Sequence, residues 1–121
     1  MDLQQTLDCG QSFRWEKVGD NCFSGIACGK AVTMSMQGTE LYIENSTVED
    51  YETIWKSYLD LDLDYGKIRE DIGKIHPVLK EATAYAPGIR ILRQEPWEAL
   101  CTFIISQNNN IKRIKGIVQR L

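Results

Sequence analysis

The sequence predicts an α+β fold, in which an antiparallel β-sheet comes first and helices that pack with it follow. Two observations support this. From Ser12 to Asn45, short segments in which apolar and polar side chains alternate are separated by glycine-containing breaks. Beyond Asn45, apolar side chains recur every three or four residues, as they do along one face of a helix. A chain of 121 residues, 43% of them hydrophobic, can bury a modest core.

The alternation is clearest in Val32–Met36 and Leu41–Ile43, and the breaks at 19–21, 29–30 and 38–39 divide the region into an antiparallel meander of about four strands. A helix should follow, capped by Ser46 or Thr47. Its apolar stripe would consist of Val48, Tyr51, Trp55 and Tyr58. Shorter helices are expected at about 64–75 and 77–85.

A domain boundary is expected near Pro87-Gly88, a pair that breaks helices. We therefore divide the chain into an α+β domain at 1–87 and a helical part at 88–121.

The charge balance changes at nearly the same place. Residues 1–89 carry eight Lys/Arg against fifteen Asp/Glu, whereas residues 90–121 carry six against two. A basic segment in an acidic chain indicates a polyanionic partner or, more simply, a solvated helical face.

Two helices are predicted after the boundary. Pro96 suits the first turn of one, and its apolar residues cover most of its circumference, so we expect a core helix packed on several sides; Trp15, Trp55 and Trp97 are all expected in the core. The second helix begins within Asn108–Asn110 and carries an apolar stripe that reaches Leu121 without a stop signal. We therefore expect the protein to continue beyond Leu121.

No membrane-spanning run and no signal-peptide core is visible, which predicts a soluble intracellular protein. The four cysteines form no Cys-x-x-Cys pair, and the single His76 cannot complete a zinc site with them. We expect reduced thiols, no metal and no cofactor. His76 should be solvated or should cap a helix.

Two motifs carry a resemblance to a known family. "LDCGQSFRW" at 7–15 and "GIRILRQEPWEALCTFIISQNNNIKRIKGIVQRL" at 88–121 resemble the 8-oxoguanine DNA glycosylases. The resemblance covers essentially the whole chain but only the amino-terminal part of such an enzyme. It implies a TATA-binding-protein-like α+β domain, followed by the first two helices of a helix-hairpin-helix glycosylase domain.

The resemblance also implies a reaction. Such enzymes act in base-excision repair: they flip 8-oxoguanine out of its pair with cytosine, excise it with a catalytic lysine, and nick the abasic strand by β-elimination. The lysine and its partner aspartate belong beyond Leu121, so the 121 residues alone should be inactive. The implied partner is damaged double-stranded DNA, with no membrane and no obligate protein partner. The expected location is cytoplasmic, with the nucleoid, in a prokaryote, or nuclear in a eukaryote.

Three residues acquire recognition roles through the motif match. Asn108 corresponds to the residue that fills the space of the flipped base, and Arg113 to the one that reads the stranded cytosine, since a guanidinium only donates and cytosine N3 and O2 only accept. The Gly10 carbonyl corresponds to the group that accepts a hydrogen bond from N7–H, which 8-oxoguanine has and guanine lacks. The simpler alternatives are a helix cap at Asn109 or Asn110 and an ordinary turn at Gly10.

Two other functions stay open from the sequence. One is a noncatalytic nucleic-acid-binding module, in which the basic helix contacts phosphate. The other is a glycosylase for alkylated bases on the same superfold.

Overall fold

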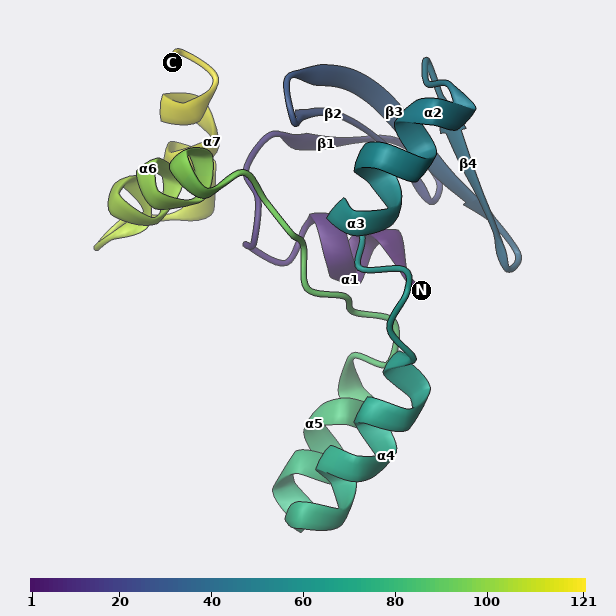
Figure 1. Ribbon diagram of the computed structural model, residues 1–121. Helices are drawn as coiled ribbons and strands as arrows, with labels where there is room; N and C mark the ends of the chain where they lie inside the picture. The colour runs from purple at the N-terminus through teal and green to yellow at the C-terminus, as the bar shows by residue number, and fades with distance from the viewer.

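A computed structural model describes all 121 residues of the chain. Its centre is a four-stranded antiparallel meander in the order β1-β2-β3-β4, formed by Trp15–Gly19, Cys22–Ala27, Lys30–Gln37 and Glu40–Glu44 (Figure 1). Val32 and Met34 are buried on one face of β3, as the alternation predicted. The α+β class and the four strands are therefore confirmed.

Tight turns join the strands and fix their register. Between β2 and β3, Cys28 and Gly29 both have positive φ, at 52° and 74°, which is the geometry of a two-residue turn that matches the strand twist. Directly behind this hairpin, the indole ring of Trp15 lies against Gly25, where a methyl group would come within 2.7 Å of a ring carbon. The glycine therefore makes room for the tryptophan in the core.

Helices complete the core on the sheet. A continuous helical segment is made of α2 (Val48–Asp50), the π-helical turn η1 (Tyr51–Trp55) and α3 (Lys56–Tyr58). Thr47 begins it with a capping box, in which its hydroxyl accepts from the Asp50 amide. A further short helix, α1 (Leu3–Leu7), was not predicted, yet both of its leucines are buried. Trp15 and Trp55 are fully buried, as expected.

Helices α4 (Tyr65–Ile75) and α5 (Pro77–Tyr85) form a hairpin that extends away from the sheet (Figure 1). Both lie where the sequence predicted them. Asp64 caps α4 through its carboxylate, and His76 caps α5 by accepting from the Val78 amide through Nδ1. The capping role expected for His76 is therefore confirmed. No residue of this hairpin is buried.

After the hairpin, residues 88–95 run back along α1. The Asp2 amide donates to the Gly88 carbonyl at 2.9 Å, and the Leu92 side chain enters the core. At Gly88 the approach is so close that a methyl group would lie 2.3 Å from the Asp2 side chain. This segment fixes the position of the two helices that follow it. The division into domains 1–87 and 88–121 stays a prediction.

Helices α6 (Pro96–Ser106) and α7 (Ile111–Val118) form a second lobe beside the sheet (Figure 1). The prediction that α6 is a core helix is wrong in this structure: Trp97 is 70% exposed, and Phe103 and Ile104 are each 62% exposed. Apolar residues around a helix show that it can be covered on several sides, but they do not show what covers it. Within the 121 residues, α7 is the helix that packs against α6. No helix in the structure combines the length and the hydrophobicity that crossing a membrane requires.

Candidate nucleic-acid interface

The first part of the candidate site is the loop between α1 and β1, which contains Gly10. Gly10 is exposed and has φ of +90°, a left-handed conformation that a side chain would strain. A methyl group on its α-carbon would meet nothing within 4 Å, so in this structure the backbone angle explains the glycine. Its carbonyl oxygen accepts no hydrogen bond within the chain. The loop therefore presents a free backbone acceptor to solvent.

Gln11 holds this loop against residues 90–94. Its Nε2 donates to the Arg90 carbonyl at 2.8 Å, its Oε1 accepts from the Leu92 amide at 3.0 Å, and its own carbonyl accepts from Gln94 Nε2 at 2.6 Å. No role for Gln11 or Gln94 was predicted from the sequence. Their presence in the two motifs, "GQSF" and "RQEP", was the only available signal. The loop is thus anchored directly after Gly10.

Tyr58 lies behind the loop and supports the start of β1. Its hydroxyl accepts from the Trp15 indole at 3.0 Å, and its carbonyl accepts from the Arg93 amide at 2.9 Å. Burial raises the pKa of Tyr58 to about 12, and hydrogen bonds with Trp15 and Ser12 oppose that shift. The phenol is therefore neutral at physiological pH, and its role is structural support.

The second part of the site is the asparagine bend between α6 and α7. Asn110 caps α7, because its Oδ1 accepts from the Arg113 amide at 3.0 Å. Asn109 closes α6, since its Nδ2 donates to the Ile105 carbonyl at 3.1 Å. Asn108 is exposed, has φ of +49°, and makes no side-chain hydrogen bond. The capping role left open in the sequence belongs to Asn110, and the amide of Asn108 stays free.

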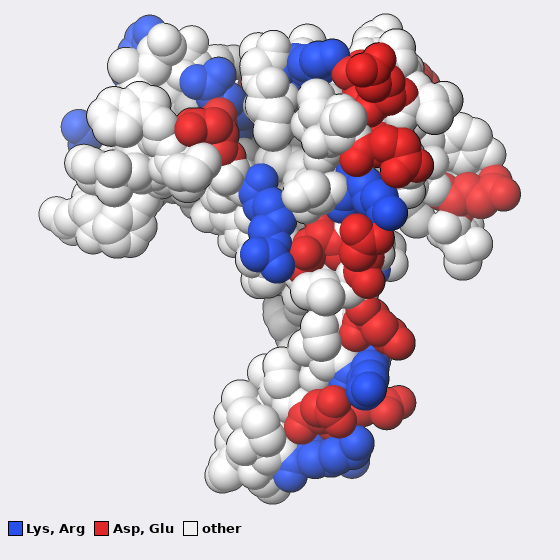
Figure 2. Space-filling model, in the orientation of Figure 1, with Lys and Arg blue, Asp and Glu red and all other residues white.

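Arg113 lies on the exposed side of α7, and its guanidinium makes no hydrogen bond or ion pair within the chain. Lys112 beside it is also exposed and unpaired. Figure 2 shows basic side chains over the lobe formed by α6 and α7, and most of the acidic ones elsewhere on this face. This lobe therefore carries the positive charge that the segment counts predicted.

The structure places α7, the helix that follows the asparagine bend, beside the residues that flank Gly10. Lys115 on α7 donates to the Asp8 carboxylate at 2.9 Å, and Gln119 donates to the Glu16 carboxylate at 3.2 Å. Helix α7 thus docks against the residues that flank the Gly10 loop. The free acceptor of Gly10 and the free donors of α7 therefore belong to two elements in direct contact.

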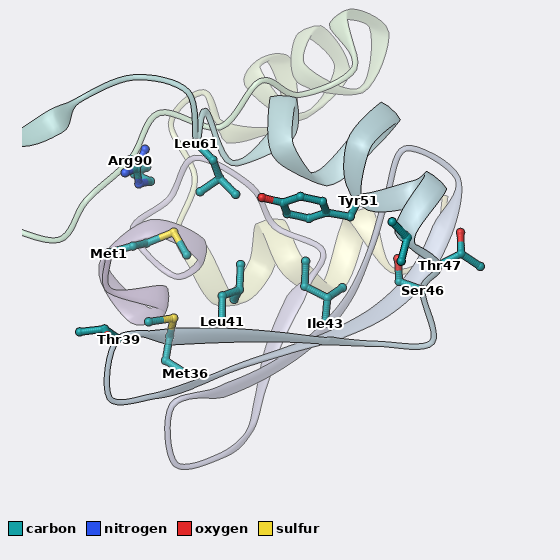
Figure 3. A pocket seen from close by; sticks show the side chains of 11 residues that line it. Met1, Met36, Thr39, Leu41, Ile43, Ser46, Thr47, Tyr51, Leu61 and Arg90 are labelled. Carbon is teal, nitrogen blue, oxygen red and sulfur yellow. The ribbon is translucent and has the colours of Figure 1, made fainter.

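The structure also has a large hollow at another position. An open hollow of about 590 Å³ lies between the sheet and the α2–α3 segment, and the apolar side chains of Leu41, Ile43 and Tyr51 point into it (Figure 3). Arg90 at its edge is engaged elsewhere: its guanidinium donates to the Asp60 carbonyl at 2.6 Å and lies 4.6 Å from the centre of the Tyr65 ring. We therefore place the candidate site at the Gly10 loop and α7.

Comparisons with known proteins agree with the motif resemblance. Residues 1–100 match the family model of the 8-oxoguanine DNA glycosylase N-terminal domain. The chain is 28% identical to N-glycosylase/DNA lyase OGG1 of Arabidopsis thaliana and 33% identical to N-glycosylase/DNA lyase of Saccharomyces cerevisiae, in each case over 98% of its own length. It spans 34% and 35% of those two proteins, about a third of their length.

A solved structure shows the same fold. It is the 8-oxoguanine glycosylase/lyase of Clostridium acetobutylicum in complex with double-stranded DNA that contains cytosine opposite 8-oxoguanine. The TM-score is 0.91 at 41% sequence identity, over 95% of this chain and 39% of that one. The fold, the two motifs and the family match together show that the chain belongs to the 8-oxoguanine DNA glycosylase family and corresponds to the N-terminal part of such a protein.

Proposed function

We propose that this chain is the recognition part of an enzyme of base-excision repair, which excises 8-oxoguanine paired with cytosine and nicks the abasic strand. The observation that carries the proposal is the set of polar groups without a hydrogen-bond partner in the Gly10 loop, the asparagine bend and α7. The Gly10 carbonyl, the Asn108 amide and the Arg113 guanidinium have no hydrogen-bond partner in the chain, whereas the neighbouring Gln11 and Asn110 side chains bond to its backbone. The names of the relatives support the same activity.

Each free group suits one step of recognition. A flipped 8-oxoguanine has an N7–H group, which can donate a hydrogen bond to the Gly10 carbonyl. Guanine instead has a lone pair at N7, which would be repelled by the lone pairs of the carbonyl oxygen. The difference between the two bases is a single hydrogen. Discrimination therefore requires a carbonyl at a fixed position, and the anchors around Gly10 supply one.

The duplex left behind has an empty position and an unpaired cytosine. The Asn108 amide is short and planar, and it offers both a donor and an acceptor to that gap. The Arg113 guanidinium can donate to N3 and O2 of the cytosine, an arrangement that adenine does not match. Opposite-base preference would follow from this contact.

Bond cleavage is proposed to use a lysine and an aspartate outside these 121 residues, as the family resemblance implies. The 121-residue chain alone should accordingly not cleave DNA. We propose duplex DNA as the partner and a location where DNA is found, in the nucleoid or in the nucleus.

The direct test uses the full-length protein on duplexes that carry 8-oxoguanine opposite each of the four bases. Strand cleavage should be fastest opposite cytosine, and borohydride should trap a covalent complex with the abasic intermediate. Failure to cleave the cytosine-paired lesion would refute the proposed substrate. Preference for an alkylated base in the same assay would support the alternative glycosylase.

A further inference from the structure

The position of the Gly10 carbonyl depends on how the residues around it are held, because the carbonyl itself accepts no hydrogen bond. On its carboxyl side, Gln11 supplies the anchor described above. On its amino side, the α1 helix ends with the Asp8 amide donating to the Gln4 carbonyl at 3.1 Å. Hydrogen bonds of the Cys9 thiol add a weaker restraint on this exposed loop.

Lys115 supplies an additional restraint from α7. Its ammonium group donates to Asp8 Oδ1 at 2.9 Å and to the Trp15 carbonyl at 3.1 Å. Asp8 stands where α1 ends and Trp15 stands where β1 begins, so one side chain joins both ends of the Gly10 loop. The Lys115 side chain is 29% exposed, and these two partners use two of its three donors.

The same helix carries Arg113, two residues before Lys115. Lys112, one residue earlier still, is exposed and has no partner in the chain, so the paired state of Lys115 is not a general property of this helix. The ammonium group therefore connects the loop proposed to read the lesion with the helix proposed to read the opposite base.

We propose that Lys115 is a positioning residue for lesion discrimination: by joining Asp8 and Trp15, it sets where the Gly10 carbonyl stands relative to α7. This inference rests on the proposed function and deepens it. Without the ammonium group, Gln11 and the buried residues still hold the fold, but the carbonyl gains freedom. Selection between two bases that differ by one hydrogen then weakens, because a misplaced acceptor binds N7–H of the lesion less well and repels N7 of guanine less strongly.

The test compares Lys115→Met with Lys112→Met in the full-length protein. Both variants remove one positive charge from α7 and keep a good helix former. The measurement is the ratio of the dissociation constants for two duplexes, one with guanine and one with 8-oxoguanine opposite cytosine. For Lys115→Met the preference for the lesion should fall about three- to tenfold, as expected for the loss of one surface ion pair and one backbone hydrogen bond. For Lys112→Met both constants should rise together and the ratio should stay the same.

Lys115→Arg keeps the charge and several donors, and should retain most of the preference. Asp8→Asn provides a second route to the same loss without changing α7. Because both variants break one contact, the double variant Asp8→Asn/Lys115→Met should lose little more than Lys115→Met alone. Thermal unfolding of every variant separates a moved loop from an unfolded domain.

The two proposals fail in different ways. If the wild-type protein binds both duplexes equally, the proposed function and this inference both fall. If the wild-type protein prefers the lesion and Lys115→Met keeps that preference, only the role of Lys115 is overturned. Fully additive losses in the double variant would also overturn it, because Lys115 would then act independently of Asp8.

Discussion

The sheet lobe and the lobe formed by α6 and α7 differ in how they use apolar side chains. In the sheet lobe, Trp15 of β1 and Trp55 of η1 are completely buried in one core cluster. In the other lobe, Trp97 and Phe103 are exposed, although α6 is rich in apolar residues. The sheet lobe therefore has its own core, while the α6–α7 lobe depends on that core for its position. The Gly10 loop lies where α7 meets the sheet lobe.

The largest expected effect is the loss of stability when the core of the sheet lobe is disrupted. Trp15→Ala in the 121-residue chain should cost about 3–5 kcal/mol, because it empties the centre of the core, whereas Trp97→Ala should change stability by about 0.5 kcal/mol or less. Urea unfolding, followed by circular dichroism, measures both. Equal losses of stability in the two variants would contradict the conclusion that the sheet lobe has a buried core and the α6–α7 lobe exposes its apolar side chains.

A second prediction distinguishes the roles of Asn108 and Asn110 in the α6–α7 lobe. Asn108→Gly suits the observed φ of +49° and removes only the amide, so the fold should stay intact. In the full-length protein, binding to lesion-containing duplex should weaken roughly 10- to 100-fold, and binding to undamaged duplex much less.

Asn110→Ala is the matched change at the helix cap. It should cost about 1 kcal/mol of stability, because the Arg113 amide loses its acceptor. An equal loss of affinity on both DNAs for Asn108→Gly would instead indicate simple phosphate contact.

A third prediction concerns the pH dependence of stability that arises from the buried Tyr58. The pKa of Tyr58 is about 12 in the folded chain and about 10 when unfolded, so the unfolded state loses its proton first as the pH rises. Stability should therefore fall between pH 10 and pH 12, by about 2 kcal/mol from this group. Tyr58→Phe should lack that part of the decline when unfolding curves of the two proteins are compared at each pH. Parallel declines would show that Tyr58 is not buried in solution.

The smallest expected effect concerns opposite-base choice. Arg113→Ala in the full-length protein should reduce the preference for cytosine over adenine opposite the lesion about five- to tenfold, because the two donated hydrogen bonds are lost. Excision rates on the two duplexes give the ratio directly. An unchanged ratio with slower excision on both duplexes would assign Arg113 to phosphate contact.

Local chemistry explains what the sequence could predict. Alternation at Val32–Met36 predicted a strand face, and Thr47 and Pro77 marked helix starts that the structure confirms. Helix α1 was missed because five residues give no readable period. The burial of α6 was predicted wrongly because an apolar surface does not reveal which elements cover it.

The site was less predictable than the fold. Gly10, Asn108 and Arg113 were chosen through the motif resemblance, and their roles stay predictions. Gln11 and Lys115 went unnoticed, because their contacts join positions about 80 and 100 residues apart. Such pairings depend on the tertiary fold and leave no local pattern in the sequence.

The most direct test of the account is a crystal structure of the full-length protein with a duplex that carries 8-oxoguanine opposite cytosine. We predict that the Gly10 carbonyl oxygen lies about 2.7–3.2 Å from N7 of the flipped base and that the Asn108 amide occupies the vacated position in the base stack. A Gly10 carbonyl turned away from the base, or a stack filled by another residue, would contradict it.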